Sequence, residues 1–410
     1  MKRTTSQPRA HKRLNAGAAR HTSTAQPPGA NSPVAMEENP DFLASQLLTY
    51  LGNKRALLKF IGAGVEQVKR GLSKERLSFF DCFSGSGVVS RYMKRHASLI
   101  IANDLERYSE IVNRCYLTNR SDVDMAEFDS VFAKWVAATR ENLAPGVITK
   151  LYAPADDGDI RPDERVFYTH ENAVLLDSAR RAVDAVVPPK YFDLVMGPLL
   201  AEASVHPNTS GVFKGFYKDR RGVGAFGGAG RNALSRICGR VALNRPVLSN
   251  FDCASEVLRG DANAVVKDLP AVDLAYFDPP YNQHPYGSNY FMLNVLADNR
   301  EPTDISAVSG IPRGWNRSAY NARRSAQTRF FELLAETPAR YLMVSYNSEG
   351  FIDYDSMLSY LRTLGSVQSV AIEYSAFRGS RNLRQRPLKV TEFLFVVRRG
   401  SRTSQKGQVK

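Results

Sequence analysis

Four aspartates follow short apolar runs in this sequence, and their positions are the first sign of chemistry. The clearest case is Asp278, which ends the run Val272–Phe277 and is followed by Pro279, Pro280 and Tyr281. Two consecutive prolines cannot continue a central strand, because each lacks an amide hydrogen and has a fixed φ. We therefore predict a carboxylate on a stiff loop at the carboxyl end of a buried strand, where open α/β sheets bind ligands.

The three other aspartates stand in the same position relative to predicted strands. Asp81 follows the run at 77–80, Asp104 lies in the stretch at 98–106, and Asp261 follows a short strand near 257–260. Asp104 comes about 20 residues after a glycine-rich turn, which is the usual place for a carboxylate that binds ribose hydroxyls. Asp104 and Asp261 are equally suited to capping the helices that follow them.

The glycine-rich turn reads Phe83-Ser84-Gly85-Ser86-Gly87 and lies between a predicted strand and a helix from Val88. Glycines at such a turn let a ligand approach the backbone at a helix N-terminus. The third glycine of the dinucleotide-binding pattern is missing, so a purely structural tight turn is the alternative. Upstream, Tyr50 and Lys54 belong to a polar turn before a helix that we expect to start near residue 53 or 54.

The charge of the chain points to a polyanionic partner. The net charge is +14 at pH 7, and neutralisation of phosphates supplies much of the affinity of proteins for nucleic acid. A glycine-rich stretch at 204–239 interleaves cations with aromatic rings, which suits phosphate contacts and base stacking. Its cations are Lys214, Lys218, Arg220, Arg221, Arg231 and Arg236. A solvated basic loop is the alternative, both here and for the basic stretch at 378–389.

The rest of the composition narrows the class of protein. Residues 1–40 are basic and poor in large apolar side chains, so we expect a disordered tail, and 401–410 form a polar tail. The four cysteines make no C-x-x-C pair, which favours reduced thiols in a cytoplasmic protein without a structural metal. No apolar run approaches the roughly 20 residues of a membrane span.

Taken together, the motifs resemble the adenine-specific DNA methyltransferases of the Dam-like (alpha) class. The order is a glycine turn, an acid after the next strand, a basic and aromatic insertion, another acid, and then D-P-P-Y. The resemblance covers about 47–399, and Cys82 stands where many members have proline. It implies S-adenosylmethionine as cofactor and double-stranded DNA as substrate.

The resemblance also implies roles for single residues. Cofactor-binding positions would be Tyr50, Lys54, Asp81, Phe83, Gly85, Gly87, Asp104, Asp261 and Asp278, and the catalytic motif would be Asp278, Pro279, Pro280 and Tyr281. In this family the turn around Gly85 holds the methionine part of the cofactor, Asp104 the ribose and Asp261 the adenine. The carboxylate of Asp278 and the carbonyl of Pro279 would accept hydrogen bonds from the target amine.

The predicted fold is α/β: a Rossmann-like, largely parallel sheet with helices on both faces and a late β-hairpin. The catalytic domain would comprise 41–120 and 251–400, with a mainly helical and loop-rich target-recognition lobe inserted at 121–250.

The predicted activity is transfer of a methyl group to the N6 amine of a flipped adenine in duplex DNA. We expect a bacterial restriction–modification setting, with a cognate endonuclease as candidate partner and the chain as a monomer or weak dimer. The alternatives are a methyltransferase for cytosine amines, RNA adenine or protein amides, or a DNA-binding module with a decayed site.

Overall fold

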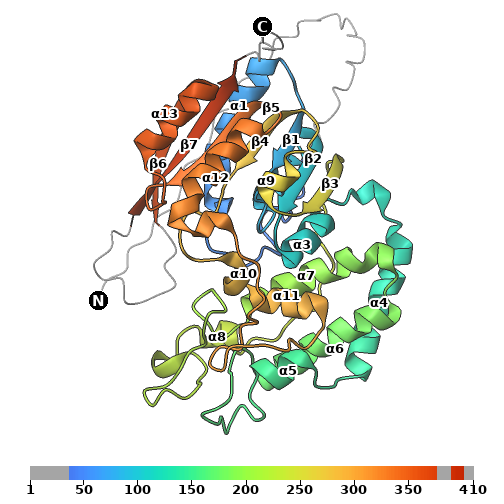
Figure 1. Ribbon diagram of the computed structural model, residues 1–410. Helices are drawn as coiled ribbons and strands as arrows, with labels where there is room; N and C mark the ends of the chain where they lie inside the picture. Colours follow the sequence, from blue (N-terminus) through green and yellow to red (C-terminus); the bar gives the residue numbers. More distant parts are fainter. Residues whose placement is uncertain (1–36, 376–388, 401–410) are drawn as a thin grey trace, which may run out of the picture. The chain divides into compact units, whose positions relative to one another are not determined.

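A computed structural model describes residues 37–375 and 389–400 of the 410-residue chain. The tail at 1–36, the basic stretch at 376–388 and the end at 401–410 lie outside the described residues, so the predictions for them stay untested. Within the described ranges the chain forms an α/β structure around one seven-stranded sheet (Figure 1).

The sheet has the strand order β3-β2-β1-β4-β5-β7-β6. Strands β1 to β5 pair in parallel, while β7 runs antiparallel to both β5 and β6. The strands are β1 Leu77–Asp81, β2 Ala97–Asp104, β3 Ala254–Arg259, β4 Val272–Phe277, β5 Ala339–Asn347, β6 Gly365–Ser375 and β7 Lys389–Arg399. The prediction of a largely parallel sheet with a late hairpin is therefore confirmed.

The central strands are apolar because both of their faces are covered. Neighbouring residues such as Phe79 and Phe80 point to opposite sides, and each enters a separate core. One face packs against α1 (Leu58–Leu72) and α2 (Val88–Met93), which follow the short 3₁₀ helix η1 (Lys54–Leu57). The other face packs against α9 (Ala262–Val265), α12 (Arg323–Glu336) and α13 (Tyr354–Leu364).

A third core belongs to a group of helices beside the sheet (Figure 1). Its helices are α3 Arg107–Leu117, α4 Met125–Glu141, α5 Val147–Tyr152, α6 His170–Val186, α7 Phe192–Val205 and α11 Phe291–Asp298. Only α4 to α7 fall inside the predicted insertion at 121–250. The helical core thus extends beyond that range, since α3 and α11 contribute Tyr108 and Phe291 to it.

Short elements connect these layers. They are η2 Arg120–Asp122, η3 Pro189–Tyr191, η4 Gly228–Gly230, α8 Leu234–Ile237, α10 Tyr286–Asn289 and η5 Ala319–Asn321. The segment at 206–253 contains only η4 and α8, so its backbone is held mainly by loop hydrogen bonds. No helix among the described residues is long and apolar enough to cross a membrane.

Candidate active site

The four aspartates predicted from the sequence meet at the carboxyl edge of the sheet. Asp81 and Asp104 are the last residues of β1 and β2, while Asp261 and Asp278 follow β3 and β4. All four line one pocket. The four strands lie side by side and pair in parallel: β1 with β2 and β4, and β2 with β3. Their carboxyl ends, and hence the four aspartates, therefore lie at the same edge of the sheet.

Most of the other predicted cofactor residues also line this pocket. These are Tyr50, Lys54, Phe83 and Gly85, together with Pro280 of the proposed catalytic motif. Gly87, Pro279 and Tyr281 are not among the lining residues. The structure adds residues that sequence reasoning missed, namely Asn103, Glu106, Tyr286, Asn316 and Tyr320.

The glycine turn after β1 has the backbone that only glycine adopts easily. Gly85 has φ +51° and Gly87, which precedes α2, has φ +75°. A Cβ at Gly85 would lie 3.0 Å from Cε1 of Tyr50, so the missing side chain allows that ring to approach. The turn is tied to the next strand, since the amide of Gly85 donates to Oδ2 of Asp104 (2.9 Å).

Asp81 presents an unsatisfied acceptor inside the pocket. Its side chain is 1% exposed, and Oδ2 accepts a hydrogen bond from Oγ of Ser90 (2.7 Å). Oδ1 is buried and has no hydrogen-bond partner among the described residues. Burial raises the pKa of Asp81 to about 7, because removal from water disfavours the ionised form. A cationic group entering the pocket would meet an acceptor that is ready for it.

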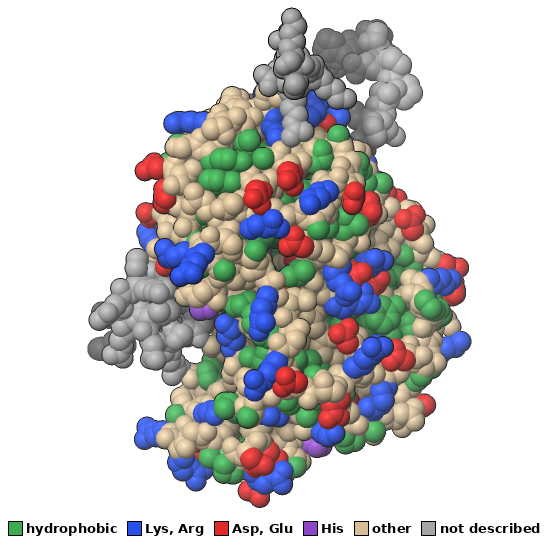
Figure 2. Space-filling model, in the orientation of Figure 1, with side chains coloured by type: hydrophobic (Ala, Val, Ile, Leu, Met, Phe, Trp, Pro, Cys, Tyr) green, Lys and Arg blue, Asp and Glu red, His purple; other side chains and the backbone are tan. Residues whose placement is uncertain are grey.

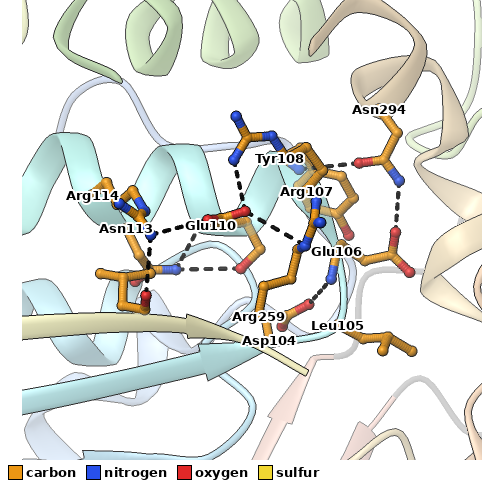
Figure 3. Close-up of polar contacts among 12 residues, drawn as sticks. Asp104, Leu105, Glu106, Arg107, Tyr108, Glu110, Asn113, Arg114, Arg259 and Asn294 are labelled. Atoms are coloured by element: carbon orange, nitrogen blue, oxygen red, sulfur yellow. Dashed lines mark hydrogen bonds and ion pairs between the residues drawn. The ribbon is translucent and has the colours of Figure 1, made fainter. Parts of the chain in front are cut away.

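Asp104 and Glu106 form the turn between β2 and α3 (Figure 3). Oδ1 of Asp104 accepts from the amide of Glu106 (2.9 Å). Oε2 of Glu106 accepts from the side-chain amides of Asn294 on α11 (2.6 Å) and Asn316 (3.2 Å). Glu106 is 2% exposed, and burial raises its pKa to about 7. The pocket wall is thereby linked to a helix of the helical core, through Asn294.

The start of α3 is fixed to the neighbouring strand by a second acid. Glu110 contacts three guanidinium groups, at 2.7 Å from Arg107, 3.1 Å from Arg114 and 3.6 Å from Arg259 (Figure 3). Arg259 is the last residue of β3 and stands two residues before Asp261. Asp261 itself caps α9, since its carboxylate accepts from the amide of Ala264 (3.2 Å). Asp261 therefore combines the capping position with a place on the pocket wall.

Asp278 forms a buried ion pair with Lys54. The Lys54 ammonium lies 2.8 Å from Oδ1 of Asp278 and 3.2 Å from Oε1 of Glu392. Lys54 is 4% exposed and Glu392 is fully buried. Burial raises the pKa of Asp278 to about 6, although Lys54 acts in the opposite direction. Glu392 lies on β7, in no recognisable motif, so sequence reasoning missed it.

Aromatic rings pack around Tyr50, which lines the pocket together with Tyr286. Tyr50 stacks on Tyr286 (4.9 Å between ring centroids) and on Tyr290 (4.5 Å). Tyr281 packs edge to face against Tyr346 (6.4 Å), and its carbonyl accepts from the amide of Phe351 (3.0 Å). The loop that follows Asp278 is thus held by contacts with β5 and with the chain just after it.

The predicted DNA-contacting cations lie on loops around η4 and α8. Lys214, Lys218, Arg220, Arg221 and Arg231 are exposed, and Figure 2 shows Lys and Arg side chains at the lower left, where Figure 1 draws these loops. Arg221 pairs with Asp219 (3.0 Å). Arg236 differs from the rest, since its half-buried guanidinium donates to the carbonyls of Val205, Pro207 and Thr209. These contacts leave Arg236 fewer donors for phosphate.

The described residues contain no group of three or more His, Cys, Asp or Glu side chains arranged to hold a metal ion. Cys82, Cys115 and Cys253 are buried free thiols, and Cys238 is an exposed one.

Comparisons with known proteins agree with the geometry. The family model described as D12 class N6 adenine-specific DNA methyltransferase matches residues 50–142 and 219–348. The type II methyltransferase M.NlaIII of Neisseria lactamica is 26% identical over 364 residues, which cover 85% of this chain and 99% of that protein. M.CviAII of Paramecium bursaria Chlorella virus 1 is 24% identical over 355 residues, covering 85% and 97%. The modification methylase LlaI of Lactococcus lactis subsp. lactis is 24% identical over 343 residues, covering 81% and 51%.

Proposed function

This chain belongs to the family of D12 class N6 adenine-specific DNA methyltransferases, and on that premise we propose that its pocket binds S-adenosylmethionine beside a catalytic Asp278. The observation that carries the proposal is the convergence of Asp81, Asp104, Asp261 and Asp278 on one pocket. A methyl donor and a target amine must lie next to each other. The pocket is lined by Asp278, so a cofactor bound in it would lie beside an amine held by that carboxylate.

The residues of the pocket fit the parts of this cofactor. The unpartnered Oδ1 of Asp81 suits the ammonium group of the methionine part, and the bare backbone at Gly85 leaves room for the chain. Asp104 and Glu106 supply carboxylate oxygens for ribose hydroxyls, beside Phe83 and Tyr320, whose rings meet at 5.1 Å near Asp261. When bound, the cofactor supplies a methyl group on a positively charged sulfur for transfer to the nitrogen of adenine.

Asp278 and Pro279 make the target amine reactive. The lone pair of an exocyclic amine is delocalised into the ring, which makes that nitrogen a poor nucleophile. A carboxylate and a carbonyl that accept its two hydrogens draw the nitrogen towards tetrahedral geometry and stabilise the positive charge of the transition state. Asp278 need not be a strong base, because the methylated ammonium is acidic and loses its proton afterwards.

The target base has to leave the helix before it can reach Asp278. A base inside a duplex is inaccessible, so we propose that adenine is flipped and stacks on Tyr281. Exposed cations of the loops around α8 would hold the backbone, with Lys214 and Arg231 as the residues to test first. The region at 121–250 would then act as the recognition lobe.

The biological setting follows from the relatives. M.NlaIII and M.CviAII are type II methyltransferases, and LlaI is a modification methylase. We therefore propose that this chain modifies DNA in a restriction–modification system and protects it from a cognate endonuclease.

Product analysis tests the proposed function. The full chain is incubated with duplex DNA and S-adenosylmethionine carrying a deuterated methyl group, and the DNA is then digested to nucleosides. The label is expected in N6-methyldeoxyadenosine. Label in a cytosine product, in RNA adenine or in protein, or no transfer to any of these, would contradict the proposal.

A further inference from the structure

The ion pair of Asp278 does not stand alone, because Lys54 has a second acidic partner on another strand. Glu392 is the fourth residue of β7 and pairs in register with Asn347 of β5 and Ile372 of β6. Its side chain therefore comes from the antiparallel part of the sheet, while Asp278 follows a parallel strand. One ammonium group connects the two acids.

We propose that Glu392 is a positioning residue for the reaction: it shares the Lys54 ammonium with Asp278 and so keeps the Asp278 carboxylate available to the target amine. This inference rests on the proposed role of Asp278. Lys54 occupies Oδ1 of Asp278 from one side, which leaves Oδ2 for the substrate.

The burial of Glu392 shows that its charge depends on these contacts. The side chain is fully buried, and an ionised carboxylate in such a place is costly unless it is paired. Oε1 receives the Lys54 ammonium and a hydrogen bond from Oγ of Ser345. Oε2 has no hydrogen-bond partner among the described residues. Among the described residues, Lys54 and Ser345 are thus the ion-pair and hydrogen-bond partners of this carboxylate.

When two acids share one cation, each acid forms a weaker ion pair than it would form with that cation alone. With both acids ionised, two negative charges face one positive charge, so the Lys54 ammonium is divided between Asp278 and Glu392. If Glu392 lost its charge, Lys54 would pair with Asp278 alone. A carboxylate in an undivided ion pair holds a proton less readily and is a weaker acceptor for the amine. Glu392 therefore preserves the acceptor strength of Asp278.

Other groups near Asp278 contribute to its ionisation and must be kept constant in a test. The titratable or charged side chains that face Asp278 or its partners, besides Lys54 and Glu392, are Asp81, Tyr276, Tyr281 and Tyr286. Of these groups, Asp81 has a pKa close to that of Asp278, at about 7 compared with about 6. On the proposed function, saturating cofactor holds Asp81 ionised through its ammonium group in every variant. A difference between variants in the fall of the methylation rate at low pH, the acid limb, then reports on Asp278.

Glu392→Gln tests the inference in single-turnover methylation at saturating cofactor and DNA. We expect the acid limb of the rate to move to lower pH than in the wild type, and the plateau rate to fall roughly tenfold, because Asp278 becomes a weaker acceptor. Cofactor and DNA affinities should stay within about threefold, since the pocket lining is unchanged. Glu373→Gln, an exposed acid of β6, is the matched control and should behave like the wild type.

Ser345→Ala provides an independent second variant if Glu392→Gln does not fold. Without the Ser345 hydroxyl, Lys54 is the remaining partner of Oε1 of Glu392 among the described residues. The Lys54 ammonium should then shift towards Glu392 and away from Asp278, which moves the acid limb to higher pH. A merely structural role would not give opposite shifts in the two variants. The inference would be overturned if either variant folded, methylated adenine at the wild-type rate and kept the acid limb of the wild type. Absence of transfer in the wild type would instead contradict the proposed function.

Discussion

Burial governs the ionisation of single residues in the pocket. Asp81 and Glu106 both have a pKa raised to about 7, and that of Asp278 is raised to about 6, with burial as the largest cause in each case. These acids therefore change charge near neutral pH, where ordinary carboxyl groups are fully ionised. The pocket can respond to pH without containing a histidine among its lining residues.

Asp81 predicts a pH dependence of cofactor binding. On the proposed function, the ammonium of the cofactor binds the ionised carboxylate, whereas protons compete for Asp81 below its pKa of about 7. Affinity should consequently be full above pH 8 and fall as the pH drops through 7, by roughly tenfold between pH 8 and pH 6. Calorimetric titration of the full chain with S-adenosylmethionine at several pH values measures this.

Asp81→Asn is the variant that isolates the effect. It should bind the cofactor more weakly at pH 8, and its affinity should depend much less on pH between 6 and 8, because Glu106 is then the remaining pocket acid with a pKa of about 7. Asp268→Asn, at an exposed position before β4, should keep the wild-type dependence. An unchanged pH dependence in Asp81→Asn would assign the titration to another group.

At the scale of elements, the strand ends were predictable and their long-range partners were not. Buried apolar runs identified β1, β2 and β4, because a strand covered on both faces has no polar alternation. Edge strand β3 carries exposed or half-buried side chains, and the sequence indicated only its end, near 257–260, before Asp261. The contacts of Glu392 with Lys54, and of Glu106 with Asn294, join residues far apart in the chain, so no local pattern could reveal them.

The glycine turn gives an element-scale prediction. Gly85→Ala puts a Cβ 3.0 Å from the ring of Tyr50 and on a backbone with φ +51°, a conformation that costs an L-residue about 1–2 kcal/mol. We expect cofactor affinity to fall at least tenfold, because Tyr50 and the turn both border the pocket. Gly215→Ala is the control, as its added Cβ would meet nothing within 4 Å. Equal cofactor affinity in both variants would refute the importance of the turn.

At the scale of the whole molecule, charge predicts how the chain meets DNA. The excess of cations predicts a nucleic-acid partner from the sequence alone, whereas the recognition sequence depends on side-chain geometry that no composition reveals. The helical core was also underestimated, because α11 follows the D-P-P-Y loop in the chain but packs with α3, α5 and α7. Distance along the sequence therefore does not show which helices share this core.

The loops around α8 give the prediction at this scale. Lys214→Ala and Arg231→Ala should each weaken binding to duplex DNA and reduce the slope of log affinity against log salt by about 0.9. Cofactor affinity should not change. Arg362→Ala, an exposed cation on α13, serves as the control and should retain the wild-type slope in fluorescence anisotropy. Joint loss of DNA and cofactor binding would indicate misfolding and remove the evidence for a DNA-contacting loop.

The central claim is that the carboxylate of Asp278 activates the target amine, and a single-turnover assay of Asp278→Asn tests it most directly. Asparagine keeps the shape but not the charge of the acceptor, so the methylation rate should fall by at least roughly 10²–10³. Cofactor and DNA affinities, measured on the same preparation, should remain close to those of the wild type, as should the rate of Asp268→Asn. Full transfer to adenine by Asp278→Asn would contradict the account.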